Sequence, residues 1–320
     1  MAVSDAKNQS RLRFWAVMGV VGPLGAALGW AIQPMVRVLP AVQMKLGGAA
    51  QDCSWGRTLA IDRDSRRLLA LRLGASQSIA VQRINDALGI DLLSTAGRPF
   101  WLKHASETLG GKKLLSYLLS EHDWIEEISR DSHVQPGDTV LDCGAHAGVF
   151  TAKALARGAA QVVSIEPDPV HVECLRRNFR KEIAEGRIVV VPQGVWSREG
   201  KLTLYRDVEN SGENSMVEER QGQAIEVSVT TIDRLVQTLQ LPRVNFIKMD
   251  IEGGERHALR GALETLRKFR PRLMIDSYHL PDDMRVLPAI IRSAHQDYET
   301  VCGPCELAGS RIIPHVTFYR

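Results

Sequence analysis

The stretch Val244-Asn-Phe-Ile-Lys-Met-Asp-Ile-Glu-Gly-Gly-Glu255 places three carboxylates directly after an apolar run and directly before a helical pattern. The apolar run predicts a strand, and the two glycines allow the backbone to turn tightly after it. In open α/β sheets, ligands bind outside the carboxyl ends of the strands. We therefore expect Asp250, Glu252 and Glu255 to mark a site of chemistry at this edge of a sheet.

Strand and helix patterns alternate along the second half of the chain. Apolar runs predict the strands, and apolar residues at helical spacing predict the helices between them. This alternation is typical of an α/β fold with a doubly wound, mostly parallel sheet that is covered on both faces. The expected strands cover residues 139–143, 162–166, 188–192, 244–250 and 272–277, and the expected helices cover 149–157, 169–185, 231–239, 255–269 and 282–295.

Two further pairs of strands depart from this alternation. Alternating stretches at residues 201–205 and 225–229 flank a polar loop, which predicts an inserted hairpin. The last two strands, at residues 298–301 and 315–319, are joined by a short loop that contains glycine and proline. Because the connection is short, we expect these two strands to pair antiparallel.

A glycine loop follows the first strand of the sheet, in Val140-Leu-Asp-Cys-Gly-Ala-His-Ala-Gly148. Gly144 and Gly148 allow a ligand to approach the backbone, and the next helix offers unpaired N–H groups at its start. Dinucleotide-binding folds use a similar turn, but Asp142 would repel an anionic pyrophosphate. A carboxylate there favours a ligand with an ammonium group and a sulfonium, such as S-adenosylmethionine. For His146 we prefer a polar residue in an exposed turn to a catalytic role.

A second acidic motif, Ser164-Ile-Glu-Pro-Asp168, ends the next strand. Glu166 would lie beside the glycine loop, where its carboxylate would accept hydrogen bonds from both ribose hydroxyls of an adenosine. The alternative is that Glu166 only adds charge to the start of the following helix. Both interpretations hold together, because Asp168 suffices as the helix cap with Pro169 at the first helical position.

These motifs together resemble a class I S-adenosylmethionine-dependent methyltransferase of the FkbM type. The resemblance covers about residues 135–320, and residues 1–134 lie outside it. It implies a Rossmann-like, seven-stranded sheet with a reversed last strand, and a hydroxyl acceptor on a small molecule, a sugar or a lipid-linked glycan. The motifs that carry it are the glycine loop at 142–148, Ile165-Glu-Pro-Asp168, Asp250-Ile-Glu-Gly-Gly-Glu255 and Ala258-Leu-Arg-Gly-Ala262.

The resemblance and the positions of the motifs assign the cofactor-binding residues. Residues 193–195, after the third strand, and Asn214-Ser-Met216, in the insertion, would border the adenine and methionine ends of the cofactor. The expected cofactor-binding residues are Asp142, Gly144, Ala145, His146, Gly148, Glu166, Pro167, Gly194 and Asp250.

Methyl transfer from a sulfonium requires the protein to hold the acceptor oxygen in line with the methyl group and to help it lose a proton. We predict Asp250 as the first catalytic candidate and His279 as the second, since a histidine has an ordinary pKa suited to base work at neutral pH. Glu252 is expected to bind or position the acceptor. Glu255 is expected to be a charge in the first turn of the following helix.

The sequence also suggests a metal site and a redox or zinc site, but both have less support than methyl transfer without a metal. Asp250, Asp276 and His279 could hold a divalent metal, but their spacing is not diagnostic, so we favour catalysis without a metal. Cys302-Gly-Pro-Cys305 follows a late strand and has no second pair to complete four ligands. We therefore expect this motif to be a tight turn with two thiols.

Composition limits the remaining classes. The chain has 320 residues, of which 44% are hydrophobic, so it can bury a substantial core. Its net charge of +3 comes from well-mixed basic and acidic residues, and this argues against a nucleic-acid partner. The five cysteines are an odd and scattered set, which favours a reducing compartment.

The amino terminus contains an uncharged segment, residues 14–36, with basic residues on both sides. Its length suffices to span a bilayer, and we predict a membrane anchor, although a buried hairpin or a signal peptide would have a similar pattern. The slightly heavier basic flank before the segment would place the rest of the chain outside the cytoplasm. The cofactor is expected in the cytosol, so we place the catalytic domain in the cytoplasm.

The expected organisation therefore has three parts: the hydrophobic segment at 1–40, a mostly helical lead-in at 41–134 and the methyltransferase domain at 135–320. Two function classes stay open at this point. The first is an O-methyltransferase tethered to a membrane. The second is a scaffold protein that binds the cofactor, or only keeps the fold, without turnover.

Overall fold

The computed structural model describes residues 39–48, 53–82, 88–103, 110–129, 132–207, 210–308 and 311–320. Residues 39–46 form a helix. Among the described residues, no helix combines the length and the apolar character that crossing a bilayer requires. The predicted anchor at residues 14–36 lies outside the described residues, so it stays a prediction.

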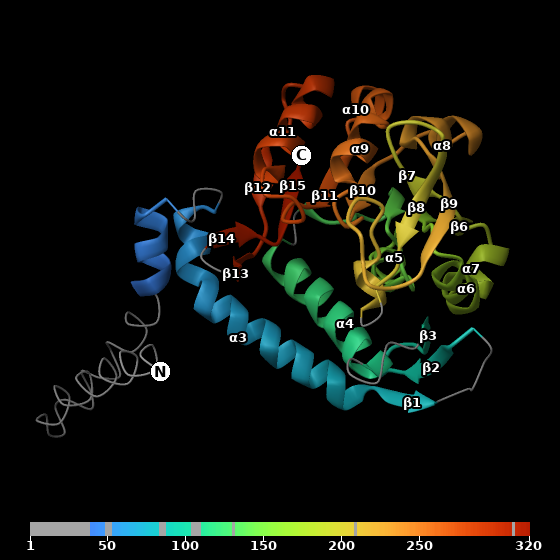
Figure 1. Cartoon of the computed structure of the whole chain (residues 1–320), viewed down its shortest axis with the longest axis horizontal. Coiled ribbons are helices and arrows are strands. Elements are labelled where there is room, and N and C mark those ends of the chain that lie inside the picture. Colours follow the sequence, from blue (N-terminus) through green and yellow to red (C-terminus); the bar gives the residue numbers. More distant parts are fainter. Residues whose placement is uncertain are drawn as a thin grey trace, which may run out of the picture.

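A seven-stranded sheet lies at the centre of the second half of the chain (Figure 1). Its strands are β4 (Thr139–Cys143), β5 (Gln161–Ile165), β6 (Ile188–Val191), β10 (Phe246–Met249), β11 (Arg272–Asp276), β12 (Thr300–Cys302) and β15 (Val316–Tyr319). The order is β12-β15-β11-β10-β4-β5-β6, and β15 runs antiparallel to both of its neighbours. The other pairs in the sheet are parallel. This confirms the predicted doubly wound sheet and the antiparallel pairing of the last two strands.

Helices cover both faces of this sheet. Successive side chains of a strand point to opposite faces, so Val140 packs in a core with Phe150, whereas Leu141 packs in the opposite core with Leu266. Strands β4 and β10 are buried on both faces, and the charged residues that they contain, Asp142 and Lys248, are buried as well. The helices are α5 (Val149–Ala156), α6 (Pro169–Asn178) and α7 (Arg180–Ala184) on the first face, and α8 (Ile232–Thr238), α9 (Glu255–Arg260), α10 (Leu263–Phe269) and α11 (Asp283–Ala294) on the second.

Two of the predicted helices are each divided in two. The helix expected at 169–185 breaks between α6 and α7, and the helix expected at 255–269 breaks between α9 and α10. At the second break, a Cβ on Gly261 would lie 2.1 Å from the Trp196 carbonyl oxygen. The Gly261 carbonyl accepts a hydrogen bond of 2.9 Å from the Asp233 N–H. The contacts of Gly261 with Trp196 and Asp233 therefore interrupt the helix. The helical spacing of apolar residues gives no sign of this break.

The insertion between β6 and β10 forms a second sheet with the order β7-β9-β8. Strand β7 (Gly194–Val195) pairs parallel with β9 (Ala224–Thr230), and β8 (Gly200–Tyr205) pairs antiparallel with β9. The predicted inserted hairpin is therefore confirmed. Its loop contains the short 3-10 helix η2 (Ser211–Glu213).

The lead-in region contains strands as well as helices. The expected helical character is met by two long helices, α3 (Trp55–Ser78) and α4 (Gly110–Ile128). An antiparallel sheet of β1 (Ala80–Gln82), β2 (Ile90–Ser94) and β3 (Phe100–Lys103) was not predicted. Its alternately buried residues are too few to give a clear period of two. Figure 1 shows α4 between α3 and the central sheet.

A second hairpin lies between β12 and β15. Strands β13 (Cys305–Ala308) and β14 (Arg311–Pro314) pair antiparallel in the segment that was expected to be a simple loop. Cys305 forms a disulfide with Cys53, so the prediction of two thiols at this turn is wrong for Cys305. The two cysteines are 252 residues apart, and no spacing pattern could have paired them. Cys143, Cys174 and Cys302 keep their thiols. The disulfide counts against the predicted reducing compartment, because disulfides persist mainly in oxidising environments.

Candidate active site

The glycine loop between β4 and α5 brings the backbone of β4 against the acidic run. Gly144 has a φ of +75°, and a Cβ there would lie 1.9 Å from the Asp250 carbonyl oxygen. Gly148 has a φ of +87°, and its Cβ would lie 2.3 Å from the Phe179 ring. Only glycine allows both the positive φ and these close approaches. The two glycines therefore fix the position of the loop relative to Asp250.

Glu166 joins the glycine loop to the end of β5. Its Oε2 accepts a hydrogen bond of 2.9 Å from the His146 N–H, and its Oε1 accepts one of 2.9 Å from the Asp168 N–H. Asp168 caps α6 by accepting a hydrogen bond from the Val170 N–H and also pairs with Arg206. The carboxylate of Glu166 thus lies at the edge of the sheet beside the loop, where the sequence placed it, and Asp168 supplies the cap.

His146 occupies a more confined place than the exposed turn that we expected. It adopts a positive φ of 49°, and its Nε2 lies 3.1 Å from the Ser211 hydroxyl of the insertion. Its ring contacts the ring of His171, with 4.1 Å between the centroids. Burial, together with the neighbouring His171 and Lys248, lowers the pKa of His146 well below its usual value, so the ring is neutral.

A first cavity opens between the glycine loop, the end of β5 and the insertion. Six of the expected cofactor-binding residues line it: Gly144, His146, Glu166, Pro167, Gly194 and Asp250. Asn214 and Met216 of the insertion line it as well. Asp142, Ala145 and Gly148 are not part of its wall. Leu118 of α4 and Ser211 of η2 line it without having been predicted, because nothing in the sequence connects those segments to the loop.

Asp142 lies beneath the loop and does not face the cavity, so the expectation that its charge meets the ligand is not met. Its side chain is fully buried, and Oδ2 accepts a hydrogen bond of 2.6 Å from Thr151 Oγ1. Burial raises the pKa of this carboxyl, although Lys248 and the Thr151 hydrogen bond act against the shift. Asp142 therefore supports the loop from below.

Lys248 is a site residue that the sequence reasoning missed. It is 3% exposed in β10, its Nζ donates a hydrogen bond of 3.0 Å to the Gly144 carbonyl, and it lies 3.7 Å from Asp142 and 3.6 Å from Asp250. Burial alone would lower its pKa, but the two carboxylates outweigh burial and raise it. A lysine within an otherwise apolar strand was the available signal, because a buried charge needs partners.

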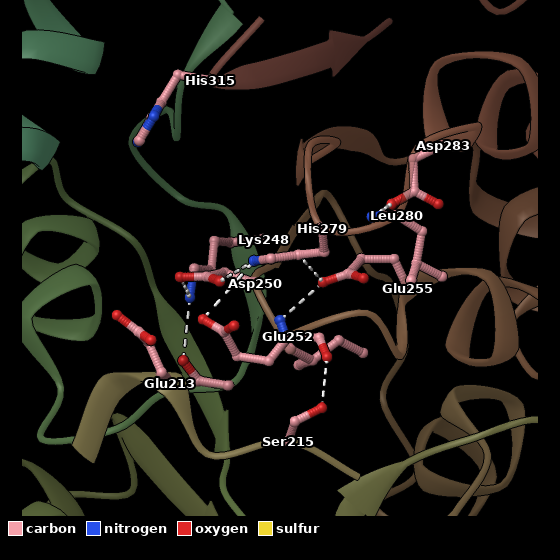
Figure 2. Close-up of polar contacts among 12 residues, drawn as sticks. Glu213, Ser215, Lys248, Asp250, Glu252, Glu255, His279, Leu280, Asp283 and His315 are labelled. Atoms are coloured by element: carbon pink, nitrogen blue, oxygen red, sulfur yellow. Dashed lines mark hydrogen bonds and ion pairs between the residues drawn. The ribbon is translucent and has the colours of Figure 1, made fainter. Parts of the chain in front are cut away.

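The acidic run wraps around His279, which follows β11. Glu255 begins α9, as predicted, but it is also fully buried: its Oε1 accepts a hydrogen bond of 2.9 Å from the Ile251 N–H and lies 3.0 Å from His279 Nδ1. On the other side of the ring, His279 Nε2 lies 3.7 Å from Asp250 Oδ1 and 3.6 Å from Glu252 Oε1. Figure 2 shows these side chains pointing toward one another. The structure therefore brings together the three predicted catalytic residues.

The prediction that His279 has a pKa near neutrality is wrong. Burial disfavours its charged form, but Glu255 and Glu252 outweigh burial and raise the pKa well above the usual value. Without a ligand, the ring is therefore an imidazolium at neutral pH and cannot accept a further proton. The metal-ligand set considered from the sequence also changes, because Glu252, and not Asp276, joins Asp250 and His279.

A second cavity adjoins the first, and Leu118, Gly212, Asp250 and Glu252 line both. None of its distal residues was predicted. His315 lies there between two carboxylates, 2.8 Å from Glu121 and 3.0 Å from Glu306, and its ring stacks on Tyr278. The other residues of this wall include Tyr117, Glu213, Arg220 and His279.

The chain is similar to known methyltransferases over part of its length. Residues 142–300 match the family model described as the methyltransferase FkbM domain. A segment of 55 residues is 42% identical to a ribosomal protein L11 methyltransferase of Symbiobacterium thermophilum, and it covers 17% of this chain and 16% of that protein.

Solved structures are similar at low sequence identity. The methyltransferase FkbM from Methylobacillus flagellatus matches 82% of this chain and 62% of its own, at 18% identity and a TM-score of 0.45. TYW2 of M. jannaschii, solved with AdoMet, matches 74% of this chain and 88% of its own, at 14% identity and a TM-score of 0.38. The chain thus spans about a sixth of the curated relative and less than two thirds of the first of these structures.

Proposed function

The chain is an FkbM-type S-adenosylmethionine-dependent methyltransferase, and from this premise we propose that it methylates a hydroxyl oxygen of a small molecule, a sugar or a lipid-linked glycan. The observation that supports this proposal most is a pair of cavities that share Asp250 and Glu252. The first cavity contains the cofactor motifs, and the second contains carboxylates and tyrosines. Methyl transfer requires two such sites that meet at the reacting atoms.

In the proposed complex, S-adenosylmethionine occupies the first cavity. Each oxygen of Glu166 accepts one backbone N–H, and a carboxylate oxygen has room for another donor, so Glu166 can also bind the ribose hydroxyls. Gly194 lines this cavity beside Met216, and a Cβ on Gly194 would lie 2.9 Å from Met216 Cε. Asp142 would support the cofactor site indirectly. It pairs with Lys248, and Lys248 donates a hydrogen bond to the Gly144 carbonyl of the glycine loop.

Asp250 is the group that we assign to the acceptor proton. It lines both cavities and is 31% exposed, so a hydroxyl in the second cavity can reach it. As the hydroxyl proton passes to the carboxylate, the oxygen forms a bond to the methyl carbon, the S–C bond breaks, and S-adenosylhomocysteine remains. His279, held by Glu255, would orient Asp250 and Glu252 around the acceptor.

The second cavity supports a polar, hydroxyl-bearing acceptor. Carboxylates of Glu121, Glu213 and Glu306 line it together with Tyr117 and Tyr278. Carboxylates accept hydrogen bonds from hydroxyl groups. The tyrosines add apolar ring faces with polar ends, against which a sugar ring can pack. Arg220, His279 and His315 line the same cavity, so its wall offers hydrogen-bond donors as well as acceptors to a polar molecule.

Helix α4 contributes to both cavities, so the site extends beyond residues 135–320. Leu118 lines both of them, and Tyr117 and Glu121 line the second. The lead-in region is thus proposed to form part of the acceptor site. Experiments on binding and transfer should therefore use the full chain.

The proposal is tested in two stages. Calorimetry of the full chain should detect one S-adenosylmethionine site, and S-adenosylmethionine with a labelled methyl group should then label members of a panel of glycans and lipid-linked hydroxyl compounds. Absence of cofactor binding would refute the proposal. Cofactor binding without labelling of any hydroxyl compound would instead favour the scaffold alternative.

A further inference from the structure

We propose that Asp250, Glu252 and His279 bind one divalent cation at the junction of the two cavities, an inference that rests on the proposed function of the same site. One ligand atom from each residue lies within 4.8 Å of those from the other two. Asp250 and Glu252 line both cavities, and His279 lines the second. A cation at this point would lie beside an acceptor hydroxyl that faces the cofactor.

The side chain of His279 has the arrangement of a metal ligand. It is 7% exposed, and its Nε2 is buried and has no hydrogen-bond partner. This nitrogen faces Asp250 at 3.7 Å and Glu252 at 3.6 Å, which is too far for hydrogen bonds (Figure 2). The other nitrogen lies 3.0 Å from Glu255. Metal-binding histidines commonly donate their second N–H to a carboxylate in this way, which fixes the ring.

The backbone holds the two carboxylates toward the same point. Asp250 directly follows β10, and Glu252 adopts a positive φ of 50°, which costs energy in a residue with a side chain. The Ser215 hydroxyl donates a hydrogen bond of 2.7 Å to the Glu252 carbonyl, and Glu255 accepts one from the Ile251 N–H between them. The turn is therefore fixed before any ligand binds.

The local charges leave room for a cation. Asp142, Asp250, Glu252 and Glu255 supply four carboxylates. Two permanent cations face them: Lys248 lies 3.6 Å from Asp250, and Arg220 lies 3.5 Å from Glu252. The carboxylates outnumber these two cations, and Arg220 also pairs with Glu218 at 3.3 Å. A divalent cation would add positive charge at the point where the carboxylates meet.

The ligand set defines the class of metal. Two carboxylate oxygens and one imidazole nitrogen, without a thiolate, favour Mg²⁺ or Mn²⁺. These ions keep several water ligands, so they leave positions for an acceptor oxygen. A bound cation would lower the pKa of that hydroxyl. The hydroxyl proton would then pass to the Asp250 carboxylate oxygen that does not bind the cation, while the acceptor oxygen bonds to the methyl carbon and the S–C bond breaks.

Mn²⁺ binding to the full chain tests the inference without cofactor or acceptor. The electron paramagnetic resonance signal of unbound Mn²⁺ should decrease when the full chain is added. The decrease should correspond to one bound ion per chain. Asp250→Asn and Glu252→Gln should each weaken this site by at least about tenfold, and Glu255→Gln, which loosens His279, by about 10- to 100-fold. Glu213→Gln is the matched control, because Glu213 lines the second cavity but lies outside the three-residue cluster. It should bind Mn²⁺ as the unaltered chain does.

Absence of Mn²⁺ binding at millimolar concentration would overturn the inference, and so would equal binding by the Glu252→Gln variant with circular dichroism showing a folded chain. Calorimetry with S-adenosylmethionine separates this result from the proposed function. A chain that binds the cofactor and transfers methyl groups at an unchanged rate after chelation refutes the metal site alone. A chain that binds Mn²⁺ at the cluster but no cofactor refutes the methyl-transfer proposal alone.

Discussion

Asp250 lies between two basic groups, Lys248 at 3.6 Å and His279 at 3.7 Å. Both are held in place by other carboxylates, Lys248 by Asp142 and His279 by Glu255. Because these charges are already in place, they hold the Asp250 carboxylate in one orientation. Little reorganisation is then needed when the acceptor binds. This arrangement explains why the acidic run contributes three carboxylates with three different roles.

Replacing Asp250 by Asn tests its assignment to the acceptor proton. The amide cannot take up this proton, so we expect kcat to fall by about 10²- to 10⁴-fold, with the dissociation constant of S-adenosylmethionine changed only a few-fold. Single-turnover transfer and calorimetry measure the two quantities. Asp297→Asn, at an exposed position, is the control. Unchanged transfer by Asp250→Asn would remove this residue from the reaction.

His315 makes a stability contribution that depends on pH. Burial lowers its pKa, but Glu121 and Glu306 outweigh burial and raise it well above the usual value. The folded chain therefore holds this proton more tightly than the unfolded chain. The contribution is complete below the unfolded pKa of about 6.5 and is lost as the pH rises through the folded pKa.

Glu121→Gln measures this contribution. We expect it to lower the free energy of unfolding by about 1–3 kcal/mol near pH 6, because a hydrogen bond between charged groups is removed. The difference from the unaltered chain should shrink as the pH rises. Urea unfolding across a pH series checks this, and a difference that stays constant with pH would contradict it.

At the scale of elements, the loop between β4 and α5 depends on its contact with the turn after β10. The parallel pairing of β4 with β10 brings the two turns to the same edge, and Gly144 then meets the Asp250 carbonyl. The acidic run and the glycine loop are therefore one structural unit, although about a hundred residues separate them.

Gly144→Ala should disturb this unit. A Cβ would lie 1.9 Å from a backbone oxygen at a φ of +75°, so we expect a loss of about 3 kcal/mol or more in unfolding free energy, together with weaker cofactor binding. Gly74→Ala in α3 is the matched control, because nothing lies within 4 Å of its Cβ position. It should stabilise the chain by about 0.5–1 kcal/mol. Equal stabilities of the two variants in urea would be inconsistent with the close approach.

At the scale of the whole molecule, two links attach the lead-in region to the carboxyl-terminal segment. Glu121 of α4 binds His315, and Cys53 is bonded to Cys305 of β13. Both links lie near the second cavity, since Glu306 follows Cys305 and lines that cavity. The lead-in region is thus held against the wall that we assign to the acceptor.

Cys53→Ser removes the second link. Closing a loop of this length restricts the unfolded chain, so we expect a loss of about 2–4 kcal/mol in unfolding free energy. A reducing agent should lower the stability of the unaltered chain to that of the variant and leave the variant unchanged. Cys302→Ser, which alters a cysteine outside the disulfide, should keep the response to reductant. The link would be disproved if reductant had no effect on the unaltered chain.

The sequence by itself determined the parallel sheet, the reversed last strand, the inserted hairpin and the positions of Gly144, Glu166 and Asp250. These features arise from local patterns: apolar runs predict buried strands, and glycines or carboxylates after them predict the edge where ligands bind. Glu255 was also placed correctly at the start of a helix. Its contact with His279 was not foreseen, because that contact depends on how the start of α9 lies relative to the segment after β11.

Only the tertiary structure decided which distant groups share the site. It placed Asp142 beneath the loop with Lys248, raised the pKa of His279 and replaced Asp276 by Glu252 in the cluster. It also brought Leu118, Glu121 and His315 to the cavities and joined Cys53 to Cys305. Burial and the proximity of charges depend on the packing of segments that are far apart in the chain. A local sequence pattern does not show which of these segments will pack together.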